Sequence, residues 1–358
     1  MNHMKTNRIM PELNWLRGIG ALLIMLYHHT TRYEEVVGHA FAWQFQLRWG
    51  CDAVCLFFVL SGFLTVWMLS QNTTAMNCAK KRVIRIDPMY WVAILVTSAV
   101  MLLIMPERVL SIPKILGNFL IFHRYLGIPS VDGVYWTLAV EMLFYLYVFA
   151  VLLLKLQKHI RWFLLLGTAA SAVYLVGFAG MEETFVGKIL GFAVMDQYGV
   201  MFFAGAFLAQ IGKNKRDLVS WIGFACNLML SILCHRSGYT MMLLICAAVI
   251  LARLFAGQKQ GYALFLEKWD RRLPLTYLAK ISFPLYLTHQ NIGRAMIQKM
   301  EQAGIQSELL ILLSVCAACI LLADLLHRFA EKPLENLCRK YIQQEKRIKT
   351  CIYSIFRD

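Results

Sequence analysis

Long apolar runs, separated by short polar segments, follow one another along most of the chain. The hydrocarbon core of a bilayer is about 30 Å thick and takes about 20 helical residues to cross, so each run of that length predicts a membrane-spanning helix. We expect ten spans, over residues 13–30, 50–70, 87–105, 136–154, 162–179, 191–211, 218–234, 239–256, 276–297 and 307–326. The pattern therefore predicts an all-α integral membrane protein, a bundle of about ten transmembrane helices.

Composition excludes a water-soluble protein. Of the 358 residues, 59% are hydrophobic and only 16% are charged, whereas soluble domains carry about a quarter charged residues. The formal net charge is +15, and the lysines and arginines gather in alternate connections and in the C-terminal tail. Because positively charged loops stay in the cytoplasm, we expect both termini to be cytoplasmic and the chain to cross the cytoplasmic membrane many times.

The connections between the predicted spans leave no room for a separate soluble domain. We expect one membrane domain over residues 1–335, followed by a basic amphipathic cytoplasmic tail over 336–358 that lies on anionic membrane lipids. The basic residues form no aromatic-interleaved face, so we expect no nucleic-acid partner. Cys316 and Cys319 form a Cys-x-x-Cys pair within apolar sequence and lack a second pair, so we expect no metal site.

The first span carries two ionisable residues on one face. Arg17 and His28 are eleven positions apart, which brings them within about 20° of each other around a helix, whereas His29 points about 100° away from His28. An arginine near the cytoplasmic entrance and a deeper imidazole suit an extended anionic thiol compound, with phosphate at one end and a reactive carbonyl at the other. The alternative is an arginine that snorkels and a histidine that hydrogen-bonds a neighbouring helix.

A basic segment precedes the third span. Asp87 suits a helix N-cap and Pro88 suits a first helical turn, so we expect the span to begin there. Arg82 and Arg85 are three positions apart and would project to the same side of a helical turn. They suit phosphate groups at the cytoplasmic surface, or they anchor the topology.

The fourth span opens with Glu141 inside apolar sequence and Tyr145 one turn later. A carboxylate at that depth is expected to be paired or protonated; its alternative role is a structural hydrogen bond between helices. In the ninth span, Ser282, Tyr286 and His289 form one polar stripe, which lines a cavity or a seam between helices. Pro284 is predicted to kink the helix between them.

These residues together resemble the membrane acyltransferase 3 family, the bacterial integral-membrane O-acyltransferases. The resemblance runs from about residue 14 to 335, and six pieces occur in family order. They are Leu16-Arg17-Gly18 with His28, Leu56-Phe57-Phe58-Val59-Leu60-Ser61-Gly62-Phe63, Arg82-x-x-Arg85-Ile86-x-Pro88-x-Tyr90, Trp136-Thr137-Leu138-x-x-Glu141-x-x-Phe144-Tyr145, Ser282 with Tyr286-Leu287-Thr288-His289, and Glu331-Lys332-Pro333.

Two departures from the family pattern concern the second and fourth spans. Many members carry Gly-Val-Asp where this chain has Ala53-Val54-Cys55, and Asp52 lies too early to be treated as the equivalent acid. Thr137 stands where serine is usual. The differences bear on the substrate and on fine geometry more than on the chemistry.

The resemblance implies transfer of an acyl group, most often acetyl from acetyl-CoA, to a hydroxyl of a cell-envelope carbohydrate, either a surface polysaccharide or its lipid-linked precursor. An imidazole, with a reference pKa of about 6.5, suits the base that such a hydroxyl needs. We expect His28 to be that base or a transient acyl carrier, with Glu141 or Tyr145 orienting it. The other contender is a non-enzymatic membrane carrier of a polysaccharide or lipid-linked glycan.

The remaining candidates divide between the two substrates. We expect the CoA phosphates of the acyl-CoA donor to be held by Arg17, Arg82 and Arg85. The path of the carbohydrate acceptor is expected to be lined by Ser282, Tyr286 and His289.

Overall fold

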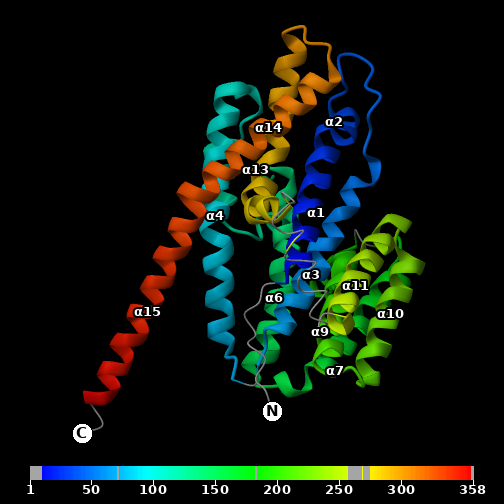
Figure 1. The fold of residues 1–358 in the computed structure, drawn as a ribbon, viewed down its shortest axis with the longest axis vertical. Helices are drawn as coiled ribbons and strands as arrows, with labels where there is room; N and C mark the ends of the chain where they lie inside the picture. The colour runs from blue at the N-terminus through cyan, green and yellow to red at the C-terminus, as the bar shows by residue number, and fades with distance from the viewer. Residues whose placement is uncertain (1–9, 71, 182–183, 257–267, 269–274, 356–358) are drawn as a thin grey trace. The chain divides into compact units, whose positions relative to one another are not determined.

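The computed structural model describes residues 10–70, 72–181, 184–256, 268 and 275–355, and over these residues it is helical without strands (Figure 1). Residues 1–9, 257–267 and 269–274, whose basic side chains entered the topology prediction, lie outside the described residues. The same holds for residues 356–358 of the predicted tail.

A helix occupies every predicted span. The ten are α1 (Pro11–His29), α3 (Val54–Trp67), α4 (Ala75–Ile104), α6 (Trp136–Leu153), α7 (Ile160–Ala172), α9 (Gly199–Lys213), α10 (Leu218–Cys234), α11 (Ser237–Ala256), α13 (Leu275–Gln302) and α14 (Glu308–Leu326). In the described part of the chain, seven helical stretches are long and apolar enough to cross a membrane, and α10 is a shorter apolar helix. A membrane helical bundle is thus confirmed, while the count of ten crossings and the side of the termini stay predictions.

Shorter elements connect these helices. They are α2 (Thr31–Val36), η1 (Arg48–Ala53), η2 (Pro106–Arg108), α5 (Ile112–Gly117), η3 (His123–Leu126), η4 (Gly133–Tyr135), η5 (Gln157–His159), η6 (Val173–Gly177), α8 (Phe185–Ala193) and η7 (Asp196–Tyr198). After α14, the π turn η8 (His327–Glu331) leads into the 24-residue helix α15 (Lys332–Ile355).

The chain forms two compact units. Unit 1 comprises residues 1–75 and 136–282, and unit 2 comprises residues 76–135 and 283–358. In unit 1, α9 packs against α3, α7, α10 and α11, and Figure 1 shows these helices gathered together. Helix α1 completes the unit by packing against α3 and α11.

Glycines bring the helices of unit 1 into close contact. A Cβ added at Gly62 would overlap the carbonyl oxygen of Phe202, and one added at Gly205 would overlap that of Val59, so α3 and α9 touch backbone to backbone. A Cβ at Gly18 of α1 would lie 2.5 Å from the carbonyl oxygen of Leu275 in α13. Small residues at such crossings are what membrane helices use to pack closely, which gives the Leu16-Arg17-Gly18 and Ser61-Gly62 pieces a structural reason.

Contacts at the two ends of unit 1 agree with the predicted alternation of its spans. At the end predicted to be cytoplasmic, Lys213 donates to the carbonyl oxygens of Val66 (2.6 Å) and Leu69 (3.0 Å), where α3 ends. At the end predicted to lie outside, Arg236 forms an ion pair with Asp52. Loops expected on the same side of the membrane therefore meet each other.

Unit 2 contains α4, most of α13, α14 and α15. Helix α14 continues through the π turn η8 into α15, and the three form one long helical stretch (Figure 1). The segment before α6 is tied down by side chains: Tyr90 donates to the carbonyl oxygen of Asn118 (2.7 Å), and the Asn118 amide oxygen accepts from the main-chain N–H of Val131 (2.8 Å). Tyr90 of the third sequence piece therefore anchors this loop.

Two predicted helix starts are wrong. Asp87 and Pro88 do not begin a helix, because α4 runs unbroken from Ala75 to Ile104 with Pro88 inside it; membrane helices tolerate internal proline when neighbouring groups satisfy the freed carbonyl. The predicted span 191–211 is interrupted before α9, since Met195 and Asp196 have φ angles of 63° and 53°. Left-handed residues end the α-helical hydrogen-bond pattern, and α9 begins only at Gly199.

Candidate functional site

His28 lies near the end of α1, where its side chain is partly enclosed. The residue is half-buried, its Nδ1 is shielded from solvent, and its ring packs edge-on against Tyr27 with 5.1 Å between ring centroids. His29, on another face, is fully buried. Arg17 is half-buried at the opposite end of the same helix, beside the close contact at Gly18. The imidazole is thus enclosed by protein on its Nδ1 side.

Glu141 joins two helices. Its Oε1 accepts a hydrogen bond of 2.5 Å from the Ser61 hydroxyl of α3 and a very short one from the Tyr145 hydroxyl of its own helix, α6. The carboxylate therefore links α3 to α6 and at the same time fixes the Tyr145 hydroxyl. Two of the sequence pieces, at Ser61 and at Glu141, meet at this point.

The basic segment of α4 belongs to unit 2. The turn that carries Arg82 and Arg85 is helical, as expected, yet Arg82 is buried and Arg85 is exposed. The Arg85 charge acts on the carboxylate of Glu331, and Glu331 in turn contacts Nδ1 of His327 at 2.5 Å. The Glu331-Lys332-Pro333 piece therefore lies beside the Arg82-x-x-Arg85 piece.

The polar stripe of α13 is divided between the units, with Ser282 ending one segment of unit 1 and Tyr286 and His289 in unit 2. Ser282 is buried and donates to the carbonyl oxygen of Ala279 (2.8 Å), within its own helix. His289 is 1% exposed and places Nδ1 3.0 Å from the carbonyl oxygens of Leu285 and Tyr286. The helix continues through Pro284.

The predicted residues thus fall into separate groups. Unit 1 holds Arg17, His28, Glu141, Tyr145 and Ser282, and unit 2 holds Arg82, Arg85, Tyr286 and His289. A hydrogen bond joins Glu141 to Tyr145, and the rings of Tyr286 and His289 lie 5.9 Å apart.

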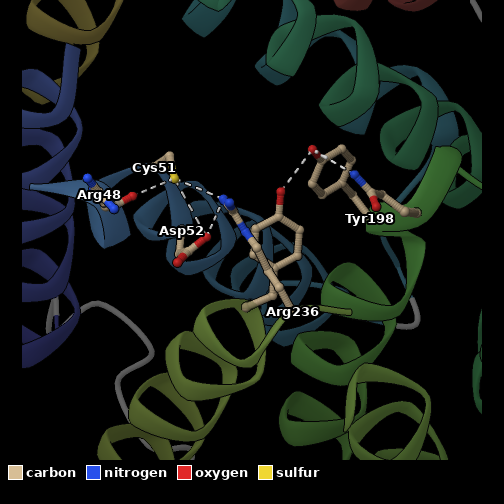
Figure 2. A network of polar contacts seen from close by, with 7 residues as sticks. Arg48, Cys51, Asp52, Tyr198 and Arg236 are labelled. Carbon is tan, nitrogen blue, oxygen red and sulfur yellow. Dashed lines mark hydrogen bonds and ion pairs between the residues drawn. The ribbon is translucent and has the colours of Figure 1, made fainter. Parts of the chain in front are cut away.

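Unit 1 contains a polar network that the sequence did not predict (Figure 2). Arg236 pairs with Asp52 and donates from Nη2 to Cys51 Sγ at 2.8 Å. Its guanidinium also lies over the Tyr239 ring, 4.7 Å from the centroid, and the Tyr239 hydroxyl is 3.3 Å from that of Tyr198. We call these five residues, Cys51, Asp52, Tyr198, Arg236 and Tyr239, the Arg236 cluster.

Three interruptions of regular helix build this cluster: η1, the break before α9 and the turn between α10 and α11. His235 secures the last two, because its Nε2 lies 2.7 Å from the carbonyl oxygen of Gln197. Burial lowers the pKa of His235, so the neutral ring donates this hydrogen bond near neutral pH. Irregular backbone at the edge of a helical bundle is tolerated where protein groups or a water-filled cavity satisfy it.

Asp132 of unit 2 was also missed. It is completely buried, and its carboxylate accepts from the main-chain N–H of Asn291 (3.0 Å) and of Val134 (3.2 Å). Asn291 returns a hydrogen bond from its side chain to the carbonyl oxygen of Val131 (2.7 Å). Burial raises the pKa of Asp132 to about 7, against the opposing effects of these N–H groups and of Arg294. Since Asp132 precedes an apolar span in the sequence, nothing local signals a buried partner.

Comparison with known proteins adds three findings. A family described as an acyltransferase domain, acyltransferase 3, matches residues 10–328. Nodulation protein 10 of Rhizobium leguminosarum bv. viciae is 28% identical to the chain over 123 residues, which cover 29% of this chain and 34% of that protein; the match therefore spans about a third of the relative's length. No solved structure matches the chain. Because the family match covers most of the sequence and contains both α1 and the Glu141 helix, the chain belongs to the acyltransferase 3 family.

Proposed function

We propose that this acyltransferase moves an acetyl group from acetyl-CoA to a hydroxyl of a cell-envelope carbohydrate, and that it does so in the cytoplasmic membrane. The observation that carries the proposal is the half-buried imidazole of His28 at the end of α1, in a chain matched by an acyltransferase family over residues 10–328. Ionisable groups in membrane helices are costly and are retained mainly for function.

The reaction needs a base and a leaving group. His28 takes the proton from the acceptor hydroxyl as its oxygen attacks the thioester carbonyl of the donor. The carbon–sulfur bond then breaks, CoA leaves as the thiolate, and the proton held by the imidazole neutralises it. The products are the carbohydrate ester and CoA, and His28 returns to its neutral form.

The other predicted residues support this step. Arg82 and Arg85 of α4 bind phosphate groups of CoA, because guanidinium groups pair with phosphate through two parallel hydrogen bonds. Glu141 acts through Tyr145, whose hydroxyl it holds, and we assign both to positioning at the reaction site.

A labelled-donor assay tests the proposal. Membranes containing the protein receive acetyl-CoA carrying a labelled acetyl group, together with O-deacylated envelope polysaccharide from the source strain. We expect release of free CoA together with label bound to the carbohydrate in alkali-sensitive ester linkage. Movement of the carbohydrate across the membrane without consumption of thioester would contradict the proposal and favour the carrier instead.

A further inference from the structure

The Arg236 cluster holds a charged group in place while leaving it open to solvent. The Asp52 side chain is 6% exposed, whereas the Arg236 side chain with which it pairs is 54% exposed. The guanidinium is fixed from three sides by the Asp52 carboxylate, Cys51 Sγ and the Tyr239 ring. Preorganisation of this kind lowers the entropy that a ligand must remove on binding.

The guanidinium keeps hydrogen-bonding capacity for a ligand. Both of its polar contacts use Nη2, and within the described part of the chain Nε and Nη1 take no partner. A guanidinium presents five N–H donors in a rigid fork. Arg236 therefore offers several outward donors at a fixed position, while the Tyr198 and Tyr239 hydroxyls beside it are buried and lie 3.3 Å from each other.

Balanced charge around the cluster indicates the kind of ligand. Arg32 pairs with Glu35 at 3.0 Å, and Arg236 pairs with Asp52. Arg32, Glu35 and Arg236 all act electrostatically on Tyr27. Arg48 of η1 adds one positive charge and Glu34 of α2 adds one negative charge, so the surroundings of the cluster carry no net charge to attract a polyanion. Aromatic surface is nearby, since Trp49 of η1 is 47% exposed. Outward guanidinium donors and an exposed aromatic side chain, in surroundings without net charge, suit a neutral, hydroxyl-rich molecule.

The cluster adjoins the end of α1 that carries the proposed base. A Cβ added at Gly50 would lie 2.7 Å from the carbonyl oxygen of Leu23 and 2.9 Å from Cβ of Tyr27, so η1 packs directly on the last turns of α1. The His28 ring packs on the Tyr27 ring. A ligand held by Arg236 is thus placed beside the helix turn of His28.

We propose that the Arg236 cluster is the binding site for the carbohydrate acceptor, and that it selects neutral sugars through their hydroxyl groups. This inference rests on the proposed function for the identity of the ligand. It differs from the sequence-based expectation, which placed the acceptor along Ser282, Tyr286 and His289 of α13.

Direct binding tests the site without requiring catalysis. The probes are O-deacylated envelope polysaccharides of the source strain, separated by anion exchange into a neutral and a uronic-acid-containing fraction. Their dissociation constants for the purified protein in detergent are measured by equilibrium dialysis, at two salt concentrations. We expect the neutral fraction to bind more tightly than the acidic one, with little dependence on salt.

Arg236→Ala should weaken binding of the neutral fraction about tenfold or more, because several hydrogen bonds to a charged donor are lost. The matched control is Arg48→Ala, which removes an equal charge from η1, the turn that supplies Cys51 and Asp52; Arg48 meets the cluster through its main-chain carbonyl, which accepts from Cys51, and the substitution keeps that carbonyl. The control should bind normally. If Arg236→Ala does not fold, Arg236→Lys keeps the charge next to Asp52 but loses the fork, and it should bind severalfold more weakly.

CoA release from acetyl-CoA, measured on the same samples, separates the two proposals. If the Arg236 variants lose binding while the unaltered protein releases no CoA, that pair of results would support the binding site and overturn the transfer proposal. Normal dissociation constants in the folded Arg236 variants would overturn the site, as would a failure of the unaltered protein to bind the neutral fraction.

Discussion

Asp52 of unit 1 and Asp132 of unit 2 are both buried aspartates near the start of an apolar helical stretch, yet the molecule satisfies them in opposite ways. Asp52 is neutralised by Arg236, which is more than half exposed. Asp132 is completely buried, and main-chain N–H groups of Asn291 and Val134 bind its carboxylate. A side-chain partner at the surface can turn towards a ligand, whereas backbone partners in the interior cannot.

The two aspartates therefore have different roles: the Asp52 ion pair belongs to a binding site, whereas Asp132 joins two segments of the fold. The Asp52 pair reaches solvent, so its contribution to stability is small and its outward donors remain for recognition. The Asp132 hydrogen bonds join the loop before α6 to the middle of α13, so their loss leaves buried N–H groups without acceptors. We therefore expect substitutions at Asp132 to affect folding and substitutions at Asp52 to affect acceptor binding.

Replacing Asp132 with alanine should produce the largest effect. The buried N–H group of Val134 and the half-buried one of Asn291 would lose this acceptor, which costs about 3 kcal/mol of folding free energy. The measurement is the thermal unfolding midpoint in detergent, followed by tryptophan fluorescence. Asp324→Ala is a matched control in unit 2, since Asp324 pairs with the largely exposed Arg328 and should change stability little. Equal midpoints for the two variants would remove the distinction drawn between the aspartates.

The pH dependence of stability sharpens the same contrast. The pKa of Asp132 is raised from 3.8 to about 7 by burial, so the folded state retains a proton that the unfolded state has lost. The contribution of protonated Asp132 to the stability of the folded state is complete below about pH 4. It is lost as the pH rises towards 7, and it stays lost above pH 7. Between these pH values, the free energy of unfolding should fall by on the order of 1 kcal/mol per pH unit.

Asp132→Asn removes this titration while keeping the side-chain shape. Its unfolding midpoint between pH 5 and 8 should fall less steeply than that of the unaltered protein. Parallel slopes for the two proteins would show that Asp132 does not titrate in this range.

Asp52→Asn should have the smallest effect on stability, within about 1 kcal/mol, because the ion pair that it weakens is open to solvent. Its effect should appear instead in recognition: the amide no longer neutralises Arg236, and the apparent KM for the neutral carbohydrate should rise severalfold while kcat changes little. A drop in unfolding midpoint as large as that of Asp132→Ala, with normal KM, would reverse the assignment.

Hydrophobic patterning was enough to predict the helices, because each membrane span must satisfy its backbone hydrogen bonds internally and so repeats the same apolar length. It could not predict where helices are interrupted. Pro88 is accommodated inside α4, and the break before α9 rests on left-handed Met195 and Asp196, neither of which is a glycine that would have signalled it.

Polar partners were predicted only where they share a helix. Glu141 and Tyr145 are four positions apart and do form a hydrogen bond. Cys51 and Arg236 are 185 positions apart, and their contact depends on the packing of η1 beside the α10–α11 turn, for which neither local sequence carries a pattern. Asp132 and Asn291 meet in the same way, through tertiary packing of α13 against a loop.

The central claim is that the imidazole of His28 activates the acceptor hydroxyl, and the initial rate of ester formation tests it most directly. His28→Ala and the control Arg48→Ala are compared in reconstituted vesicles with saturating acetyl-CoA and neutral carbohydrate. Loss of a general base costs about 10²–10⁴-fold in rate, so His28→Ala should lose at least a hundredfold while Arg48→Ala keeps the full rate. Ester formation by folded His28→Ala at the rate of the unaltered protein would contradict the account.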